Sequence, residues 1–131
     1  MSQNRNDHTA FQVSDMDAAI EFYTEALGLH LLFRDINHEE QEAYAFLELD
    51  GGNLELIQKL DTPFVKRPIV PPYCPHFALA TDDMSRVLRM IQEKGIKVVK
   101  GPLEIPEKER WIYIHDPDDN VIEYIEWSSE T

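Results

Sequence analysis

The amino-acid sequence predicts an α+β protein of two tandem β-α-β-β-β modules, on three observations. "HTAFQV" (residues 8–13) and "HFALAT" (76–81) each open with a histidine, and these histidines are 68 residues apart. "DGGNLELI" (50–57) and "DDNVIEYI" (118–125) recur at the same offset. In each half, a helix-like apolar stripe and strand-like stretches lie between the two repeats. A constant offset at both ends of a segment indicates an internal duplication.

The first half begins with a predicted strand over residues 8–13. Ser14 or Asp15 is expected to cap a helix, because a short polar side chain can accept a hydrogen bond from the first-turn amides. Residues 29–36, 41–50 and 53–60 predict three strands, with the turn sequence DGGN before the last. The apolar stripe of the helix recurs at helical spacing and stops at Gly28: Met16, Ala19, Ile20, Tyr23 and Leu27.

The segment between the halves predicts a linker. Residues 61–75 carry five of the eight prolines, and proline lacks the amide donor that a helix interior or a central strand needs. The expected organisation is therefore a single domain over residues 1–131, with a first module at 8–60, the linker at 61–75 and a second module at 76–127. A length of 131 residues suits one domain or two half-sized modules that share a core.

The second half repeats the plan. A predicted strand at 76–80 leads to Asp82 or Asp83 as the helix cap, and Gly95 ends the helix after Lys94. Strands are expected at about 96–101, 110–115 and 121–127. The helix again carries an apolar stripe: Met84, Val87, Leu88 and Ile91.

The composition narrows the class of partners. The net charge of −13 disfavours nucleic acid and anionic membranes, because both repel a strongly negative surface. The polar start MSQNRND predicts neither a signal peptide nor a membrane span. The single cysteine, Cys74, cannot form an internal disulfide, so a reducing cytoplasm is the expected location.

The duplication places two pairs of potential metal ligands in one register. His8 corresponds to His76 and Glu55 to Glu123, and the glutamate follows the histidine by 47 residues in each half. Side chains alternate along a strand, so each histidine shares a face with an alanine two residues on and points into space that this small residue leaves open. Two imidazoles and two carboxylates suit one divalent ion, namely zinc, nickel, cobalt, manganese or iron, and leave positions for a substrate. The opposite faces carry the apolar residues expected to pack under the helices: Phe11, Val13, Phe77 and Leu79.

Each of these residues taken singly has a simpler interpretation. A histidine near a chain end is usually a surface residue, and a glutamate on a half-exposed strand is usually solvated. Ancestry alone could also preserve the pattern without metal. The conjunction of two histidines and two glutamates at one offset favours a metal site. The remaining candidates lack such partners: His30, His38 and His115 are expected on the surface or in turns, Cys74 as a small residue of the linker or as a nucleophile near the site, and Phe46, Trp111, Tyr113 and Tyr124 in the core or lining the cavity.

These residues and motifs resemble the vicinal oxygen chelate superfamily, and within it bacterial glyoxalase I. The resemblance covers essentially the whole chain. "HTAFQVSDMDAAIEFYTEALGLHLL" (8–32) is similar to the family's opening, and "DPDDNVIEYIE" (116–126) is similar to its closing turn and strand. Asp119 replaces the usual glycine of that turn, and aspartate tolerates unusual turn dihedrals better than most residues.

The resemblance implies a cupped mixed sheet of paired modules, the glyoxalase/bleomycin resistance/dioxygenase fold, commonly in a homodimer that exchanges modules. It implies a divalent metal held by His8, Glu55, His76 and Glu123, which binds two oxygens of a small-molecule substrate and stabilises an enediolate. Glu123 is then the first candidate base for moving a proton between adjacent carbons, with Glu55 as its counterpart. The implied activity is that of a metal-dependent lyase or isomerase of the lactoylglutathione lyase type, acting on a 2-oxoaldehyde hemithioacetal or a similar oxygen-chelating substrate.

Two positions depart from glyoxalase I. That family usually has Arg four residues after the first ligand and Asn four residues after the second, and both contact glutathione. Here the residues are Gln12 and Lys59. The metal set is retained while the thiol contacts are altered, so a thiol other than glutathione is expected.

Other functions of the superfamily stay open at this point. An acyl-thioester epimerase would use Glu55 and Glu123 as bases on opposite faces, although epimerases prefer Gln at the second ligand. A ring-opening dioxygenase would leave Glu55 surplus, and fosfomycin-type thiol transferases also use three ligands. A non-catalytic drug-binding protein, like the bleomycin resistance proteins, would suit the negative charge but generally lacks the metal set.

Overall fold

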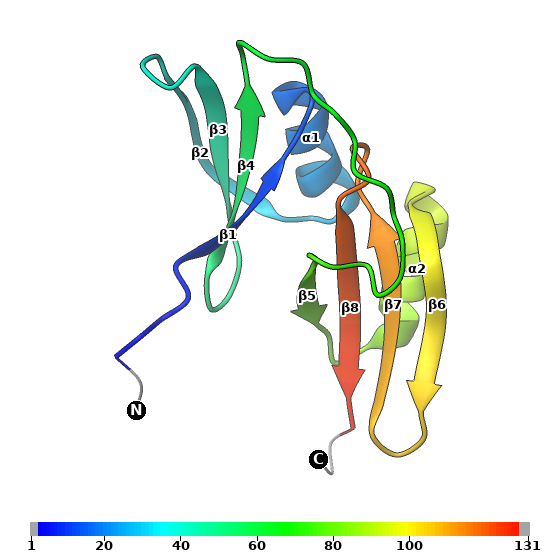
Figure 1. The fold of residues 1–131 in the computed structure, drawn as a ribbon. Helices are drawn as coiled ribbons and strands as arrows, with labels where there is room; N and C mark the ends of the chain where they lie inside the picture. Colours follow the sequence, from blue (N-terminus) through cyan, green and yellow to red (C-terminus); the bar gives the residue numbers. More distant parts are fainter. Residues whose placement is uncertain (1–2, 129–131) are drawn as a thin grey trace. The chain divides into compact units, whose positions relative to one another are not determined.

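The computed structural model describes residues 3–128, and the chain divides between Lys66 and Arg67 into two compact units. They are called module one (up to Lys66) and module two (from Arg67). Each has a four-stranded mixed sheet with helical structure on one face (Figure 1). The α+β class and the β-α-β-β-β order predicted for each half are confirmed.

Module one has the sheet order β1-β4-β3-β2, in which β1 runs parallel to β4 and the other neighbours are antiparallel. Asp15 caps α1 by accepting a hydrogen bond from the amide of Ala18. The elements are β1 (His8–Gln12), α1 (Met16–Glu21), the π-helical turn η1 (Phe22–Ala26), β2 (His30–Asn37), β3 (Glu42–Glu48) and β4 (Asn53–Lys59).

The helix of module one differs from the single regular run expected up to Leu27. After Glu21 the hydrogen bonding changes to the wider π pattern, in which the amide of Leu27 donates to the carbonyl of Phe22 over 3.2 Å. A π turn rotates the following residues relative to an α-helix. Tyr23 and Leu27 remain buried through this change, so the apolar stripe still reaches the core.

Module two has the equivalent sheet order β5-β8-β7-β6. Asp83 caps α2 by accepting from the amide of Arg86, and Gly95 ends the helix at a φ of 65°. The elements are β5 (Phe77–Ala80), α2 (Met84–Lys94), β6 (Lys97–Ile105), β7 (Glu109–His115) and β8 (Val121–Trp127).

Strand β6 runs farther than the expected end near residue 101. Gly101 and Pro102 form an irregular segment, because Lys100 pairs with Tyr113 and Leu103 pairs with Trp111. The strand continues because β6 lies at the sheet edge, where a proline without an amide donor breaks no ladder on the outer side. The Gly101-Pro102 segment, where the strand was expected to end, is therefore a bulge within β6.

Alternation along the strands separates a core face from an open face in each module. The core faces pack against α1 or α2, and most of their side chains are fully buried, although Phe77 and Leu79 are half-buried. The open face of module one is defined by Ala10, Glu55 and Phe46 on one row and Gln12, Ile57 and Tyr44 on the next. The open face of module two is defined by Ala78, Glu123 and Tyr113 on one row and Ala80, Ile125 and Trp111 on the next.

Candidate metal and substrate site

The first ligand pair meets at the start of β1. Strands β1 and β4 run parallel with Ala10 opposite Glu55, and alanine leaves room for larger neighbours. Nε2 of His8 lies 3.3 Å from Oε1 of Glu55. The Glu55 side chain is 16% exposed and that of His8 is 38% exposed, so the pair lies near the surface of the open face.

The second pair repeats this arrangement in module two. Ala78 lies opposite Glu123 on the parallel strands β5 and β8. Nε2 of His76 lies 2.9 Å from Oε1 of Glu123, with side chains 18% and 12% exposed. The structure therefore brings each predicted histidine beside its predicted glutamate within one module.

These distances fit two ligands of one divalent ion. Metal–ligand bonds of about 2.1 Å put neighbouring ligand atoms about 3.0 Å apart at a right angle and about 3.4 Å apart at a tetrahedral angle. The observed separations, 3.3 Å and 2.9 Å, also suit direct hydrogen bonds between histidine and glutamate. Within residues 3–128 no cluster of three or more His, Cys, Asp or Glu side chains could hold a metal. Each module therefore brings together one predicted histidine and one predicted glutamate.

A cluster of aromatic rings lies on one side of the His8–Glu55 pair. Phe46, opposite Glu55 on β3, packs edge-on against the His8 ring at 5.3 Å between centroids. Phe33 of β2 stacks on Phe46 at 5.2 Å and is 50% exposed. Tyr44 meets both rings edge-on. Phe46 was an expected candidate, whereas Phe33 and Tyr44 were missed because their contact depends on cross-strand register.

In module two the corresponding wall carries hydroxyl groups. Tyr113, opposite Glu123, packs edge-on against the His76 ring at 5.4 Å, and Tyr73 packs against Tyr113 at 4.9 Å. Burial, followed by the negative charge of Glu123, raises the pKa of Tyr113 above its ordinary value of 10.0. Tyr113 therefore stays protonated near neutral pH and can donate a hydrogen bond.

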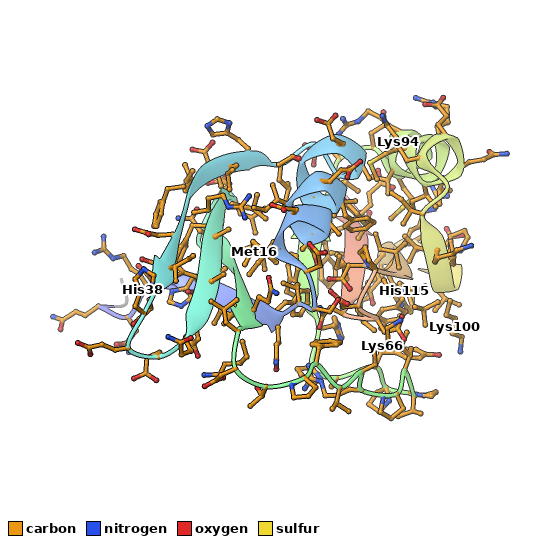
Figure 2. The ribbon with its side chains drawn as sticks, turned by 90° about the horizontal axis from the view of Figure 1, so that it is seen from above. Met16, His38, Lys66, Lys94, Lys100 and His115 are labelled. Carbon is orange, nitrogen blue, oxygen red and sulfur yellow. The ribbon has the colours of Figure 1, made fainter. Side chains whose placement is uncertain are left out.

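The remaining candidate residues of the sequence analysis lie on the surface, at a strand end, next to His76 and in the core. His30 and His38 are exposed, and His38 lies on the turn between β2 and β3 (Figure 2). His115 is half-buried at the end of β7, with Nδ1 2.8 Å from the Asp116 carbonyl oxygen. The exposed Cys74 has its Sγ 3.9 Å from Nδ1 of His76. Tyr124 is buried in the core and lines no open face.

The two positions that depart from glyoxalase I lie farther along the open face of module one. Gln12 is an exposed residue on β1, opposite Ile57. The Lys59 ammonium donates to the Glu40 carbonyl oxygen over 2.7 Å and lies 3.7 Å from Glu42 and 3.6 Å from Asp61. The charge of Lys59 is therefore largely compensated within module one.

The fold and the duplicated histidine–glutamate pairs define the class of protein. The family model described as the glyoxalase/bleomycin resistance protein/dioxygenase superfamily matches residues 5–124, and the chain belongs to this superfamily. The described part of the chain contains no helix with the length and apolar character needed to cross a bilayer.

Several relatives carry names that bear on function. A probable lactoylglutathione lyase of Vibrio cholerae is 30% identical over 131 residues, covering 96% of this chain and 93% of that protein. A probable chloroplastic lactoylglutathione lyase of Arabidopsis thaliana is 31% identical over 91% of this chain, which spans only 35% of that protein. The solved structure of TnmS3, an antibiotic-binding protein from Streptomyces, is 25% identical with a TM-score of 0.73 and covers 98% of this chain and 99% of that one. The similar proteins thus include some named as probable lyases and one named as an antibiotic-binding protein.

Proposed function

We propose that this protein is a metal-dependent, glyoxalase I-like lyase or isomerase. Its substrate would be a 2-oxoaldehyde hemithioacetal or a similar small molecule with two adjacent oxygens. The observation that carries the proposal is the histidine–glutamate pair, repeated on equivalent strands with Nε2 facing Oε1 in both modules. A drug-binding protein without catalysis would not need this pair twice.

The proposed metal site joins both pairs. His8, Glu55, His76 and Glu123 would hold one divalent ion, which is zinc, nickel, cobalt, manganese or iron by its donor set. The ion supplies Lewis acidity when bound. Metal analysis of the purified protein should find one ion per four-residue set, and His8→Ala or His76→Ala should each remove it. Full metal content in either variant would contradict the proposal.

The two glutamates have different proposed roles. Glu123 would take a proton from one carbon of the substrate and return it to the next, since a carboxylate has two oxygens and only one faces His76. The protonated phenol of Tyr113 lies on the neighbouring strand and can donate a hydrogen bond near the reacting oxygens. Glu55, opposite the hydrocarbon ring of Phe46, would serve mainly as a ligand.

Glutathione is proposed to be a poor thiol for this protein. Its two carboxylates need cationic partners, but Gln12 is uncharged and Lys59 is already engaged by Glu40, Glu42 and Asp61. A charged hydrogen bond contributes about 1.5–3 kcal/mol and a neutral one about 0.5–1.5 kcal/mol, so binding should weaken roughly tenfold. Steady-state kinetics with glutathione, other small thiols and no thiol tests this. A kcat/KM of about 10⁶ M⁻¹s⁻¹ or more with glutathione would contradict the proposal that glutathione is a poor thiol.

The proposed assembly is a homodimer. Each module has one core face and one open face, and a second open face would be needed to enclose a substrate. The segment over residues 61–75 would allow the modules to pair within one chain or with a second copy. The proposed domain remains residues 1–131, with sequence repeats at 8–60 and 76–127 inside the two modules. Light scattering at micromolar concentration should give twice the chain mass, and a monomeric mass would contradict the dimer.

A second candidate function is the binding of a drug-like ligand without turnover. The likeness to TnmS3, named as an antibiotic-binding protein, favours it, as does the net charge of −13, which suits a cationic ligand. Metal content separates the candidates. A metal-free protein that binds an organic cation and turns over no hemithioacetal would support this second function against the first.

A further inference from the structure

The two ring nitrogens of each candidate ligand histidine face different acceptors. In module one, Nδ1 of His8 lies 2.7 Å from Oδ2 of Asp7, closer than the 3.3 Å between Nε2 and Glu55. In module two the order reverses, with Nδ1 of His76 3.1 Å from the Tyr73 carbonyl oxygen and Nε2 2.9 Å from Glu123. The closer acceptor therefore faces Nδ1 in His8 and Nε2 in His76.

This reversal decides where each ring carries its proton. A neutral imidazole has one N–H and one lone pair, so only one nitrogen can donate. Shorter hydrogen bonds to charged acceptors are the stronger ones. For His8, the carboxylate at 2.7 Å favours a proton on Nδ1. For His76, the closer acceptor is the Glu123 carboxylate, whereas Nδ1 faces a neutral carbonyl, and the proton is favoured on Nε2.

We infer that Asp7 holds His8 in the Nδ1–H tautomer, in which Nε2 offers its lone pair to a metal, whereas His76 would first have to release its Nε2 proton to solvent and take up a proton from solvent at Nδ1. The inference rests on the proposed metal role of both Nε2 atoms. The number of protons on His76 does not change, and the Tyr73 carbonyl accepts from Nδ1 afterwards. Asp7 is a positioning residue, because it acts on the ion only through His8.

The backbone of module two places an acceptor beside Nδ1 of His76, which suits the tautomer with its proton on Nδ1. Tyr73 has a φ of 69°, a left-handed conformation that is costly for a bulky residue. In this conformation its carbonyl oxygen lies beside Nδ1 of His76 while its ring packs on Tyr113. The acceptor beside Nδ1 is thus a side-chain carboxylate in module one, which a substitution can remove, and a main-chain carbonyl in module two.

The first experiment reads the tautomers without metal. Two-bond ¹H–¹⁵N correlation spectra of the metal-free protein at about pH 9, above the usual histidine range, should show His8 protonated on Nδ1 and His76 on Nε2. Asp7→Ala should shift His8 toward Nε2–H, because Glu55 is its remaining acceptor. Asp50→Ala removes an exposed carboxylate from the same module and should leave His8 unchanged. His8 protonated on Nε2 in the unaltered protein, or indifferent to Asp7→Ala, would overturn the inference.

The second experiment measures metal affinity by cobalt(II) absorption. Partners of metal-bound histidines typically affect affinity 10–100-fold. Since the Asp7 side chain is 90% exposed and screened by solvent, Asp7→Ala should weaken cobalt binding about tenfold. The cobalt affinity of Asp7→Asn should lie between those of Asp7→Ala and the unaltered protein, because the asparagine amide oxygen accepts a hydrogen bond but carries no charge. The cobalt affinity of Asp50→Ala should match that of the unaltered protein. Equal affinity in Asp7→Ala would refute the role of Asp7. Absence of cobalt binding in the unaltered protein would refute the proposed function instead, and the tautomer spectra would still decide the inference.

Discussion

Module one and module two repeat one sheet order and one histidine–glutamate pair, but the residues around the pair differ. Phe46 and Phe33 line the pair in module one, whereas Tyr113 and Tyr73 line it in module two. Module one has thirteen acidic and four basic residues, and module two has twelve and eight. The duplication has thus kept the sheet order and the histidine–glutamate pair while the surrounding side chains diverged.

The difference indicates a division of labour between the modules. Beside His8 the nearest rings, Phe46 and Phe33, offer an apolar surface, and the Tyr44 phenol lies on the next row. Beside His76 the nearest ring is the Tyr113 phenol, which can donate a hydrogen bond to oxygens that gain negative charge. Under the proposed function, module two is the expected place for proton transfer, and module one the expected place for an apolar group of a substrate. The predictions below test this comparison, beginning with the largest expected effect.

The largest effect should come from the two glutamates. Glu123→Gln is expected to lower turnover about 10²–10⁴-fold, because glutamine can still offer an oxygen to metal but cannot accept a proton near neutral pH. Glu55→Gln should lower turnover less. Single-turnover kinetics on metal-loaded protein, with circular dichroism as a control for folding, measures both. Near-normal turnover in Glu123→Gln with a large loss in Glu55→Gln would reverse the assignment of the modules.

The two cores should respond alike to a matched truncation. Leu54 and Ile122 are 68 residues apart and both fully buried. Leu54→Ala and Ile122→Ala should each lower the free energy of unfolding by about 2–5 kcal/mol through lost burial and a residual cavity. Denaturant unfolding is followed by circular dichroism, and by tryptophan fluorescence for module two, which holds both Trp111 and Trp127. A loss below 1 kcal/mol in one variant would show that its core repacks.

A pH effect on stability is expected from the buried phenol of Tyr124 in module two. Burial raises the pKa of Tyr124 to about 12 from 10.0, and the equivalent position in module one is Leu56. Below pH 10 both folded and unfolded states keep the phenol proton. Above it the unfolded state loses the proton first, so stability falls as pH rises toward 12, by at most about 2–3 kcal/mol.

The control for this effect is Tyr124→Phe, which has no phenol proton to lose. Tryptophan fluorescence during denaturant unfolding should show a midpoint that falls between about pH 9.5 and 11.5 in the unaltered protein. The midpoint of Tyr124→Phe should fall less over the same pH range. An identical pH profile in the two proteins would place the effect in another group.

The smallest effect is expected at the helix caps. Asp15 accepts from the amide of Ala18 and Asp83 accepts from that of Arg86, each over 3.1 Å. Asp15→Ala and Asp83→Ala should each cost about 1 kcal/mol, while the matching asparagine variants, which keep the acceptor, should cost less. Thermal unfolding compares the four proteins. A much larger loss for Asp15→Ala would show that the short α1 depends more on its cap than α2 does.

The sequence by itself determined the duplicated fold and its histidine–glutamate pairs. The constant offset of 68 residues aligns equivalent strand positions, and alternation along a strand assigns each residue to a face, so the pairing of His8 with Glu55 and of His76 with Glu123 was predictable. The helix caps, Asp15 and Asp83, were predictable to within one residue, because capping depends on residues within one helical turn.

Only the tertiary structure decided which groups surround those pairs. The stacking of Phe33 on Phe46 depends on a register shift in β2, and the extension of β6 depends on its place at a sheet edge. The partners of Nδ1, a carboxylate at Asp7 and a carbonyl at the left-handed Tyr73, depend on rotamers and on one unusual backbone dihedral. Periodicity assigns residues to faces, but contact distances between side chains come only from packing in three dimensions.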